Sequence, residues 1–377
     1  MVVLLSKHME FEMDKIDVFK DLGITKYINA HDTYTVYGGS RMGDQAIEAM
    51  NQIRKHFVDF NELEEKVGKA IAKITDNEDC FITNGAAGAL TLTAAVCMCG
   101  DNPYYYQQLP TVVDGVKDEF ILLKCQRNAY DKSLQAAGAK IVEVGDADET
   151  LDFELEGRIN ERTAAIVYFE NRKYAQGSMP LEDVVRIARK RNIPVILDVA
   201  ALLPPKKNLS VFSKMGVDYV IFSGGKSLAG PQDSGLVFAS SKNVELMRKF
   251  GAPNHGICRG SKVSRESIVA LYYAVKIFLA RDENVFAEQC LSRIEQIRTV
   301  FIKHDIPTEI VNYGPVGQAY VRLKAEFGIK ERAKAFRESM LAKHIYVGQE
   351  STAIMISPVN VNEEEVSTLL EAIENCL

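Results

Sequence analysis

The chain has 377 residues, of which 47% are hydrophobic and 25% are charged, and its formal net charge is −6. This acidic balance gives no indication of a basic face for nucleic acid, and no apolar run reaches the roughly 18–20 residues that a membrane span needs. Residues 1–15 have no basic region or clear cleavage site of a signal peptide. The odd number of cysteines, seven, suits a reducing compartment. We therefore expect a cytoplasmic protein without a membrane or nucleic-acid partner.

Helical and strand patterns alternate along the first 255 residues. Apolar spacing predicts helices at 45–57 and 61–74, the second beginning with a capping-box pattern at Asn61 and Glu64. The elements expected next are a strand at 80–83, a helix at 86–99, a strand at 120–125, a helix at 128–137, strands at 140–144 and 164–169, a helix at 181–191, and strands at 193–197, 217–222 and 235–239. Short apolar strands separated by helices predict an α/β fold with a mostly parallel sheet covered on both faces.

The pattern changes after residue 256. Long helices are expected at 264–281 and 284–303, followed by strands near 306–311, 318–323 and 353–356 and a last helix with Asn362 as N-cap. The sequence thus predicts a large domain at 41–255 and a smaller α+β domain at 256–377. The N-terminal segment 1–40 is not assigned to either.

A lysine without acidic neighbours in the sequence marks the candidate site. Lys226 lies in VIFSGGKSLAGPQDSG (220–235), just after a predicted strand, and Ser223 ends that strand. Asp198 ends the predicted strand at 193–197, and Asn84 begins the turn TNGAAGAL (83–90). Ligands of open α/β sheets bind at the carboxyl ends of the strands, so we expect these side chains to lie together.

This set of residues is suited to pyridoxal 5'-phosphate (PLP). An amine such as that of Lys226 forms a Schiff base with the cofactor, and a carboxylate such as Asp198 pairs with its pyridine nitrogen. The small residues Gly85 and Ala86, with Asn84, would let a helix N-terminus approach its phosphate. Beyond these, Arg127 and Asn128 are candidates to cover the ring. From the residues alone, a cofactor-free lysine aldolase and a phosphate site in which Lys226 is only a charge remain alternatives, and no metal site is expected.

Seven stretches carry a family resemblance over most of residues 27–280. They are YINAHDTYTVYGGSRM (27–42), FVDFNELEEKVG (57–68), FITNGAAGAL (81–90), QRNAYDKSLQAAGAKIVEVG (126–145), SMPLEDVVRIARKRNIPVILDVAALLPP (178–205), VIFSGGKSLAGPQDSGL (220–236) and GICRGSKVSRESIVAL (256–271). The chain resembles PLP-dependent enzymes of fold type I, in particular the group similar to selenocysteine synthase (L-seryl-tRNA selenium transferase). Within it, the D-glucosaminate-6-phosphate ammonia-lyase branch is the most similar.

The resemblance implies an aspartate aminotransferase-like fold in a homodimer or larger homo-oligomer. It implies that Lys226 carries the cofactor, that Asp198 contacts the ring nitrogen, and that Gly85, Ala86 and Ser223 hold the phosphate. The expected reaction is α,β-elimination, which releases ammonia and a 2-keto acid from an amino acid, with a phosphorylated amino-sugar acid as a plausible substrate. An aminotransferase, a racemase, a β-replacement enzyme and a catalytically silent PLP-fold protein are the alternatives.

Substrate recognition is the least defined part of the prediction. A phosphorylated substrate needs cations, for which Arg41, Arg259 and Lys262 are candidates, and the resemblance adds Tyr37 to the pocket. Leu202 and Gly260 stand where the ammonia-lyase branch is expected to have glutamine and proline. These departures fall near the expected substrate pocket, so they place the identity of the substrate in doubt more than the cofactor.

Overall fold

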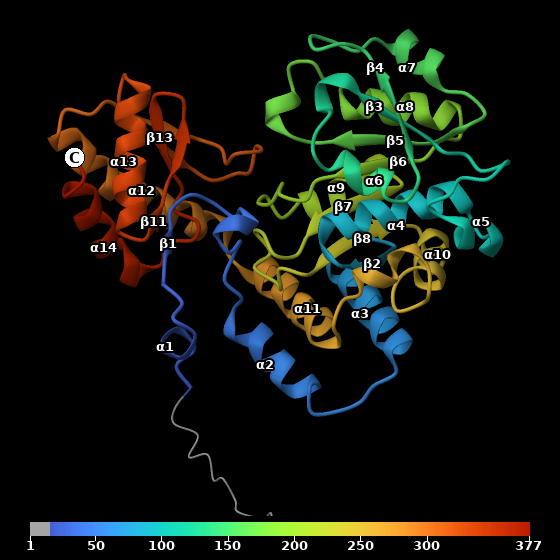
Figure 1. Ribbon diagram of the computed structural model, residues 1–377, viewed down its shortest axis with the longest axis horizontal. Coiled ribbons are helices and arrows are strands. Elements are labelled where there is room, and N and C mark those ends of the chain that lie inside the picture. The colour runs from blue at the N-terminus through green and yellow to red at the C-terminus, as the bar shows by residue number, and fades with distance from the viewer. Residues whose placement is uncertain (1–15) are drawn as a thin grey trace, which may run out of the picture.

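The computed structural model describes residues 16–377, so the N-terminal stretch considered above for a signal peptide lies outside the described part. A seven-stranded sheet forms the centre of the large unit (Figure 1). In spatial order its strands are β2 (Asp79–Thr83), β8 (Gly235–Ala239), β7 (Tyr219–Ser223), β6 (Val195–Asp198), β5 (Thr163–Phe169), β3 (Glu119–Leu123) and β4 (Lys140–Val144). Most of these strands are buried along their whole length, as expected for a sheet covered on both faces.

The predicted mostly parallel sheet is confirmed, with one antiparallel strand. β4, β3, β5, β6 and β7 pair in parallel, whereas β8 runs antiparallel to both β7 and β2. Only residues 224–234 join β7 to β8, and a parallel crossover needs about a dozen or more residues, usually including a helix. The chain therefore turns back along β7, and the turn is the segment that contains Lys226.

Helices cover both faces of this sheet. One face packs against α4 (Gly85–Cys99), α6 (Asp131–Gln135) and α10 (Ser241–Phe250), and the other against α3 (Phe60–Ile74), α8 (Leu181–Lys190) and α11 (Arg265–Ala280). The remaining helices of this part are α2 (Asp44–Ile53), α5 (Pro103–Gln108), α7 (Asp152–Arg158) and α9 (Asn208–Met215). In the described part of the chain, none of the helices has the length and apolar character needed to cross a membrane.

A smaller unit follows, at the other side of Figure 1. Its antiparallel sheet has the order β12 (Gly348–Glu350), β13 (Ala353–Ile356), β10 (Arg322–Glu326) and β9 (Thr308–Val311). It packs against α12 (Glu283–Lys303), α13 (Lys330–Ala342) and α14 (Glu363–Glu374). From the N-terminal segment, which begins with α1 (Val18–Leu22), β1 (Ile28–Asn29) pairs with β11 (Ile345–Tyr346), so this segment is attached to the smaller unit.

The packing of α11 bears on the division between the units. Ile268, Leu271 and Val275 of α11 belong to the core of the seven-stranded sheet, whereas Ile294 and Ile297 of α12 belong to the core of the smaller unit. We therefore propose a division at the connection between α11 and α12, in place of one near residue 255. The apolar pattern that predicted both helices does not show which core each helix faces.

The predicted capping box at Asn61 and Glu64 is wrong. The side chain of Asp59 caps α3 by accepting a hydrogen bond from the backbone N–H of Glu62 at 2.8 Å, so the helix begins two residues earlier than expected for an N-cap at Asn61. Glu64 is instead buried, with 4% of its surface exposed, and contacts Arg248 of α10. Its role depends on a partner 184 residues away, which a local pattern cannot reveal.

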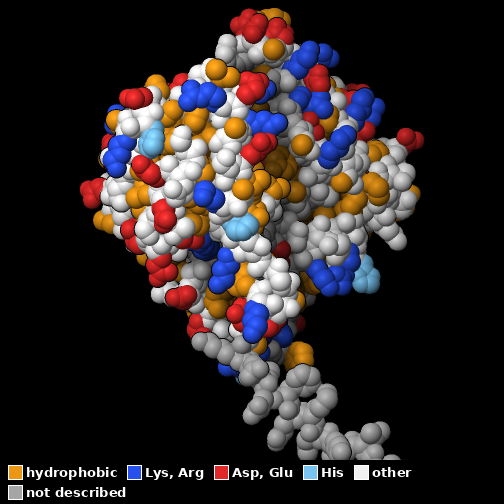
Figure 2. All heavy atoms as spheres, turned by 60° about the vertical axis from the view of Figure 1, so that its left-hand side comes forward, with side chains coloured by type: hydrophobic (Ala, Val, Ile, Leu, Met, Phe, Trp, Pro, Cys, Tyr) orange, Lys and Arg blue, Asp and Glu red, His pale blue; other side chains and the backbone are white. Residues whose placement is uncertain are grey.

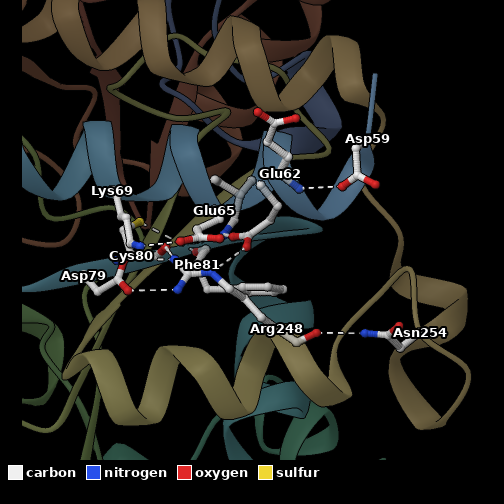
Figure 3. A network of polar contacts seen from close by, with 11 residues as sticks. Asp59, Glu62, Glu65, Lys69, Asp79, Cys80, Phe81, Arg248 and Asn254 are labelled. Carbon is white, nitrogen blue, oxygen red and sulfur yellow. Dashed lines mark hydrogen bonds and ion pairs between the residues drawn. The ribbon is translucent and has the colours of Figure 1, made fainter. Parts of the chain in front are cut away.

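Arg248 joins α3, β2 and α10 through two buried carboxylates (Figure 3). Its Nε lies 3.0 Å from Glu64 Oε2, and its Nη1 and Nη2 lie 2.9 Å from the two carboxylate oxygens of Asp79. Glu64 Oε1 also accepts the backbone N–H of Ile82 at 3.2 Å. Burial raises the pKa of Glu64 to about 7, although the charge of Arg248 acts in the opposite direction.

Glu64 should make the protein less stable as the pH rises. Its pKa is about 7 in the folded chain against an ordinary value of 4.5, so the folded state holds the proton more tightly than the unfolded state. The resulting stabilisation is complete below pH 4.5 and is lost through pH 7, amounting to up to about 3 kcal/mol. Denaturant unfolding between pH 4.5 and 8 should show this decline in the wild type and not in Glu64→Gln. Parallel pH profiles of the two proteins would contradict it.

Candidate active site

The predicted site residues meet at a cavity of about 490 Å³ at the carboxyl ends of the central strands. Asp198 is the last residue of β6 and Ser223 the last of β7, while Lys226 follows in the turn to β8. Residues 84–87, at the start of α4, also line the cavity. The lining includes seven of the predicted residues, Asn84, Gly85, Ala86, Asn128, Asp198, Ser223 and Lys226.

Asp198 is a carboxylate held at the floor of the cavity. Its backbone lies between Phe169 of β5 and Ile221 of β7 in the sheet register, and only 8% of its surface is exposed. Oδ1 accepts the backbone N–H of Ala200 at 2.8 Å. Burial raises the pKa of Asp198, while that hydrogen bond and the charge of Lys226 lower it. A cationic N–H donor placed at this carboxylate would complete its pairing.

Lys226 is positioned by a tight turn, and its ammonium group has no hydrogen-bond or ion-pair partner among residues 16–377. The backbone N–H of Gly224 donates to the Ser234 carbonyl at 2.8 Å, and that of Ala229 to the Lys226 carbonyl at 2.8 Å. Burial lowers the pKa of the Lys226 amine, and the charges of Asp198 and Asp32 oppose this shift. A desolvated amine loses its proton more readily, which is the condition a nucleophile or base requires.

Gly225, next to Lys226, has no space for a side chain. A Cβ there would lie 2.6 Å from Cα of Gln232, which contacts the Gly225 carbonyl through its side-chain amide. Ser40 Oγ donates to the same carbonyl at 2.9 Å. The two glycines before the lysine therefore allow the turn to fold closely against the chain that follows it.

The start of α4 presents unpaired donors to the cavity. Asn84 is the N-cap, but its side chain makes no capping hydrogen bond, and Gly85 adopts φ +64°, a conformation that favours glycine. The N–H groups of the first turn and the positive end of the helix dipole suit a phosphate. Lys226 and Asp198 line the same cavity and supply an amine and a carboxylate. The donors, the amine and the carboxylate match the three parts of PLP that a protein must bind.

The smaller unit and the N-terminal segment supply residues that sequence analysis missed. Asp32, 2% exposed, accepts hydrogen bonds from Tyr320 Oη at 2.8 and 2.9 Å and from the backbone N–H of Thr33 at 2.7 Å. Burial, and then the charge of Asp32, raise the pKa of Tyr320. Asp32 and Thr33 line the cavity, and so does Gln318. The stretch HDTYTVY contained the signal, but no strand pattern placed it at a sheet end.

Other predicted site residues lie outside this cavity in the described chain. Arg127 is bound to Asp131 at 2.5 Å and also contacts Glu143. Arg259 and Lys262 are exposed, at or beside a 3-10 turn at Ile257–Ser261. Their roles remain predictions.

Tyr37 and Arg41 lie near the cavity without lining it. Tyr37 packs against Tyr346 and His31, with ring centroids 4.5 and 4.7 Å apart. Arg41 lines a second, smaller cavity described below. The roles of both in substrate binding also remain predictions.

Comparison with known proteins assigns the family. The family model of L-seryl-tRNA selenium transferase matches residues 131–300. A 5'-C-glycyluridine monooxygenase-decarboxylase from Streptomyces is 30% identical over 286 residues, which are 74% of this chain and 69% of that protein. The chain belongs to the selenocysteine synthase-like group of fold-type I PLP-dependent enzymes. As a member of this group, it uses pyridoxal 5'-phosphate as its cofactor, as predicted.

Two further similarities extend along the chain of this selenocysteine synthase-like protein. A D-glucosaminate-6-phosphate ammonia lyase from Salmonella typhimurium is 27% identical over 320 residues, 84% of this chain and 83% of the relative. A solved structure of D-glucosaminate-6-phosphate ammonia-lyase superimposes with a TM-score of 0.82 at 23% identity, covering 96% of this chain and 98% of the other. The superposition confirms the predicted fold type I, including the smaller C-terminal unit.

Proposed function

We propose that the protein is a PLP-dependent ammonia-lyase that converts an amino acid into a 2-keto acid and ammonia by α,β-elimination. The observation that carries the proposal is a single cavity lined by both Lys226, whose amine has a lowered pKa, and the buried carboxylate of Asp198. Similarity to the Salmonella ammonia lyase over 84% of the chain supports the choice of reaction.

The lining residues would have distinct roles in binding the cofactor. The first-turn N–H groups at Gly85 and Ala86, with the hydroxyl of Ser223, would bind the phosphate, and Asp198 would accept a hydrogen bond from the protonated ring nitrogen. Lys226 would provide the covalent attachment. The bound cofactor supplies an electron sink for the pair of electrons left when a proton is removed from the substrate.

Lys226 would have a second role after the substrate amine has replaced the Lys226 amine at the cofactor. Its free amine accepts the proton from the substrate Cα, and burial favours the neutral form that can do so. The same group then donates that proton to a hydroxyl leaving from the β-carbon. Hydrolysis of the released product gives the 2-keto acid and ammonia.

The proposed substrate is a phosphorylated amino-sugar acid such as D-glucosaminate 6-phosphate. The relative from Salmonella and the basic residues Arg41, Arg259 and Lys262 support this choice. We also propose a homodimer or larger homo-oligomer, because Arg259 and Lys262 are exposed in one chain and a second copy would bring cations to the cavity. The cytoplasmic location stays a prediction.

The reaction is tested by measuring two products, ammonia and 2-keto acid, together with oxygen uptake by the PLP-loaded protein. Phosphorylated amino-sugar acids and β-hydroxy amino acids are screened as substrates. With a compound that reacts, the protein should form ammonia and 2-keto acid in equal amounts without oxygen uptake. Keto acid that forms only with an added keto-acid acceptor would establish an aminotransferase instead. Oxygen uptake would favour the chemistry named for the Streptomyces relative, which is 30% identical.

A further inference from the structure

A second cavity, of about 290 Å³, adjoins the first because Thr33 and Lys226 line both. Three arginines, Arg41, Arg281 and Arg293, also line it, and no aspartate or glutamate is among its lining residues. The chain as a whole carries a net charge of −6, and the face in Figure 2 mixes basic and acidic side chains. Four basic side chains around one small cavity therefore make a local positive field that attracts anions.

Of these three arginines, Arg281 is the one whose charge is least neutralised by contacts with acidic side chains. It lies between α11 and α12, with its guanidinium carbon 3.8 Å from the ring centroid of Phe286. Its Nε and Nη2 are buried and have no hydrogen-bond acceptor among residues 16–377. Burial lowers the pKa of Arg281. Leaving two buried N–H donors of a cation without an acceptor is unfavourable, so this position favours a bound anion.

The two nitrogens of Arg281 that lack an acceptor lie on one edge of its guanidinium. Nε and Nη2 carry parallel N–H groups that match two oxygens of a carboxylate or a phosphate. Both atoms are covered by protein, so binding requires the guanidinium to turn toward the cavity that it already lines. An arginine whose role was only structural would instead have a carboxylate or carbonyl at this edge.

The other two arginines are partly paired. Arg293, with 14% of its side chain exposed, contacts Glu363 at 2.5 Å through Nη2, while its Nε is buried without an acceptor in the described chain. Arg41 is half exposed and contacts Glu365 at 2.5 Å. Arg293 can therefore assist Arg281, whereas Arg41 would first have to release its glutamate.

We propose that Arg281, assisted by Arg293, binds a second anionic group of the substrate, a phosphate or a carboxylate. The inference rests on the proposed function, because the cavity is a substrate site only if Lys226 carries out the chemistry. It narrows the substrate class to amino acids that bear an additional oxyanion group. Arg281 thereby joins the predicted cations of the substrate site as a residue that no motif had indicated.

Anion binding can be measured without turnover. Holoprotein, in which the cofactor phosphate occupies the start of α4, is titrated calorimetrically with inorganic phosphate and, separately, with acetate. Arg281→Gln should raise the Kd for at least one of these anions tenfold or more, and Arg281→Lys should restore part of the affinity. Arg298→Gln is the matched control, because Arg298 lies on α12, is only partly buried, and contacts Glu295 at 3.4 Å and Thr308 at 3.2 Å, outside both cavities.

The outcomes separate this inference from the proposed function. A loss of phosphate affinity alone assigns a phosphate subsite, and a loss of acetate affinity alone assigns a carboxylate subsite. Wild-type holoprotein that binds neither anion, or Arg281→Gln that binds both as tightly as the wild type, overturns the inference. If Arg281→Gln does not fold, Arg293→Gln should raise the Kd for at least one of the two anions at least threefold. An unchanged Kd in that variant overturns the inference. None of these results depends on whether ammonia is released.

Discussion

Lys226→Ala should lose turnover by at least about 10³-fold, because removal of one side chain deletes both the attachment of the cofactor and the proton acceptor. The amine is held by the turn at 224–234, and burial has already lowered its pKa. Lys173 also lines the first cavity, but among the described residues Lys226 is the only lysine that lines both cavities. Ammonia release by the variant and the wild type, each saturated with substrate, gives the measurement.

The control for this loss is a lysine of equal charge far from the cavity. Lys303, exposed near the end of α12, should be replaceable by alanine without a change in turnover. The visible spectrum provides a second readout, since reduction with borohydride should fix the cofactor to Lys226 in the wild type and leave it dissociable in Lys226→Ala. Wild-type turnover in that variant, or a fixed cofactor on another lysine, would contradict the assignment.

Asp198→Asn should lower turnover by about 10²-fold or more while the protein stays folded, because it removes a buried charge that faces a developing charge in the cofactor ring. Asparagine has nearly the same shape, and its side-chain oxygen can still accept the backbone N–H of Ala200. The loss should therefore appear in kcat rather than in the melting temperature.

Asp218 offers a matched control within the same sheet. It is a half-buried carboxylate that accepts the backbone N–H of Val195 at 2.8 Å, at the end of β6 opposite to the cavity. Burial raises the pKa of Asp218 as it does that of Asp198. Asp218→Asn should leave kcat unchanged, and equal losses in the two variants would show that the effect of Asp198 is only structural.

The active site is closed by contacts between the two units. The backbone N–H of Arg172 donates to the Val316 carbonyl at 3.1 Å, and that of Ala319 to the Pro204 carbonyl at 3.0 Å. Tyr320 then reaches Asp32 of the N-terminal segment, 288 residues away in sequence. The cavity is therefore shaped by three separate parts of the chain, while the residues predicted to bind the cofactor come from the large unit alone.

Sequence alone was sufficient for the central sheet and for the residues at its strand ends. Asp198, Ser223 and Lys226 directly follow or end apolar strands, and parallel strands end at a common edge, so the local pattern implies their proximity. The same holds for Asn84, which directly follows β2, and for Gly85, the first residue of α4. These predictions succeed because each depends on contacts within one element or between neighbouring strands.

Only the tertiary structure decided which charges face one another. Glu64 was expected to cap a helix and instead binds Arg248, and Arg127, whose role at the cofactor ring stays a prediction, pairs with Asp131 and Glu143. Arg281 lies at the end of a helix whose pattern gives no sign of a cavity. A charged side chain has no periodic signature, because its partner is selected by the packing of distant elements, and that packing exists only in the folded chain.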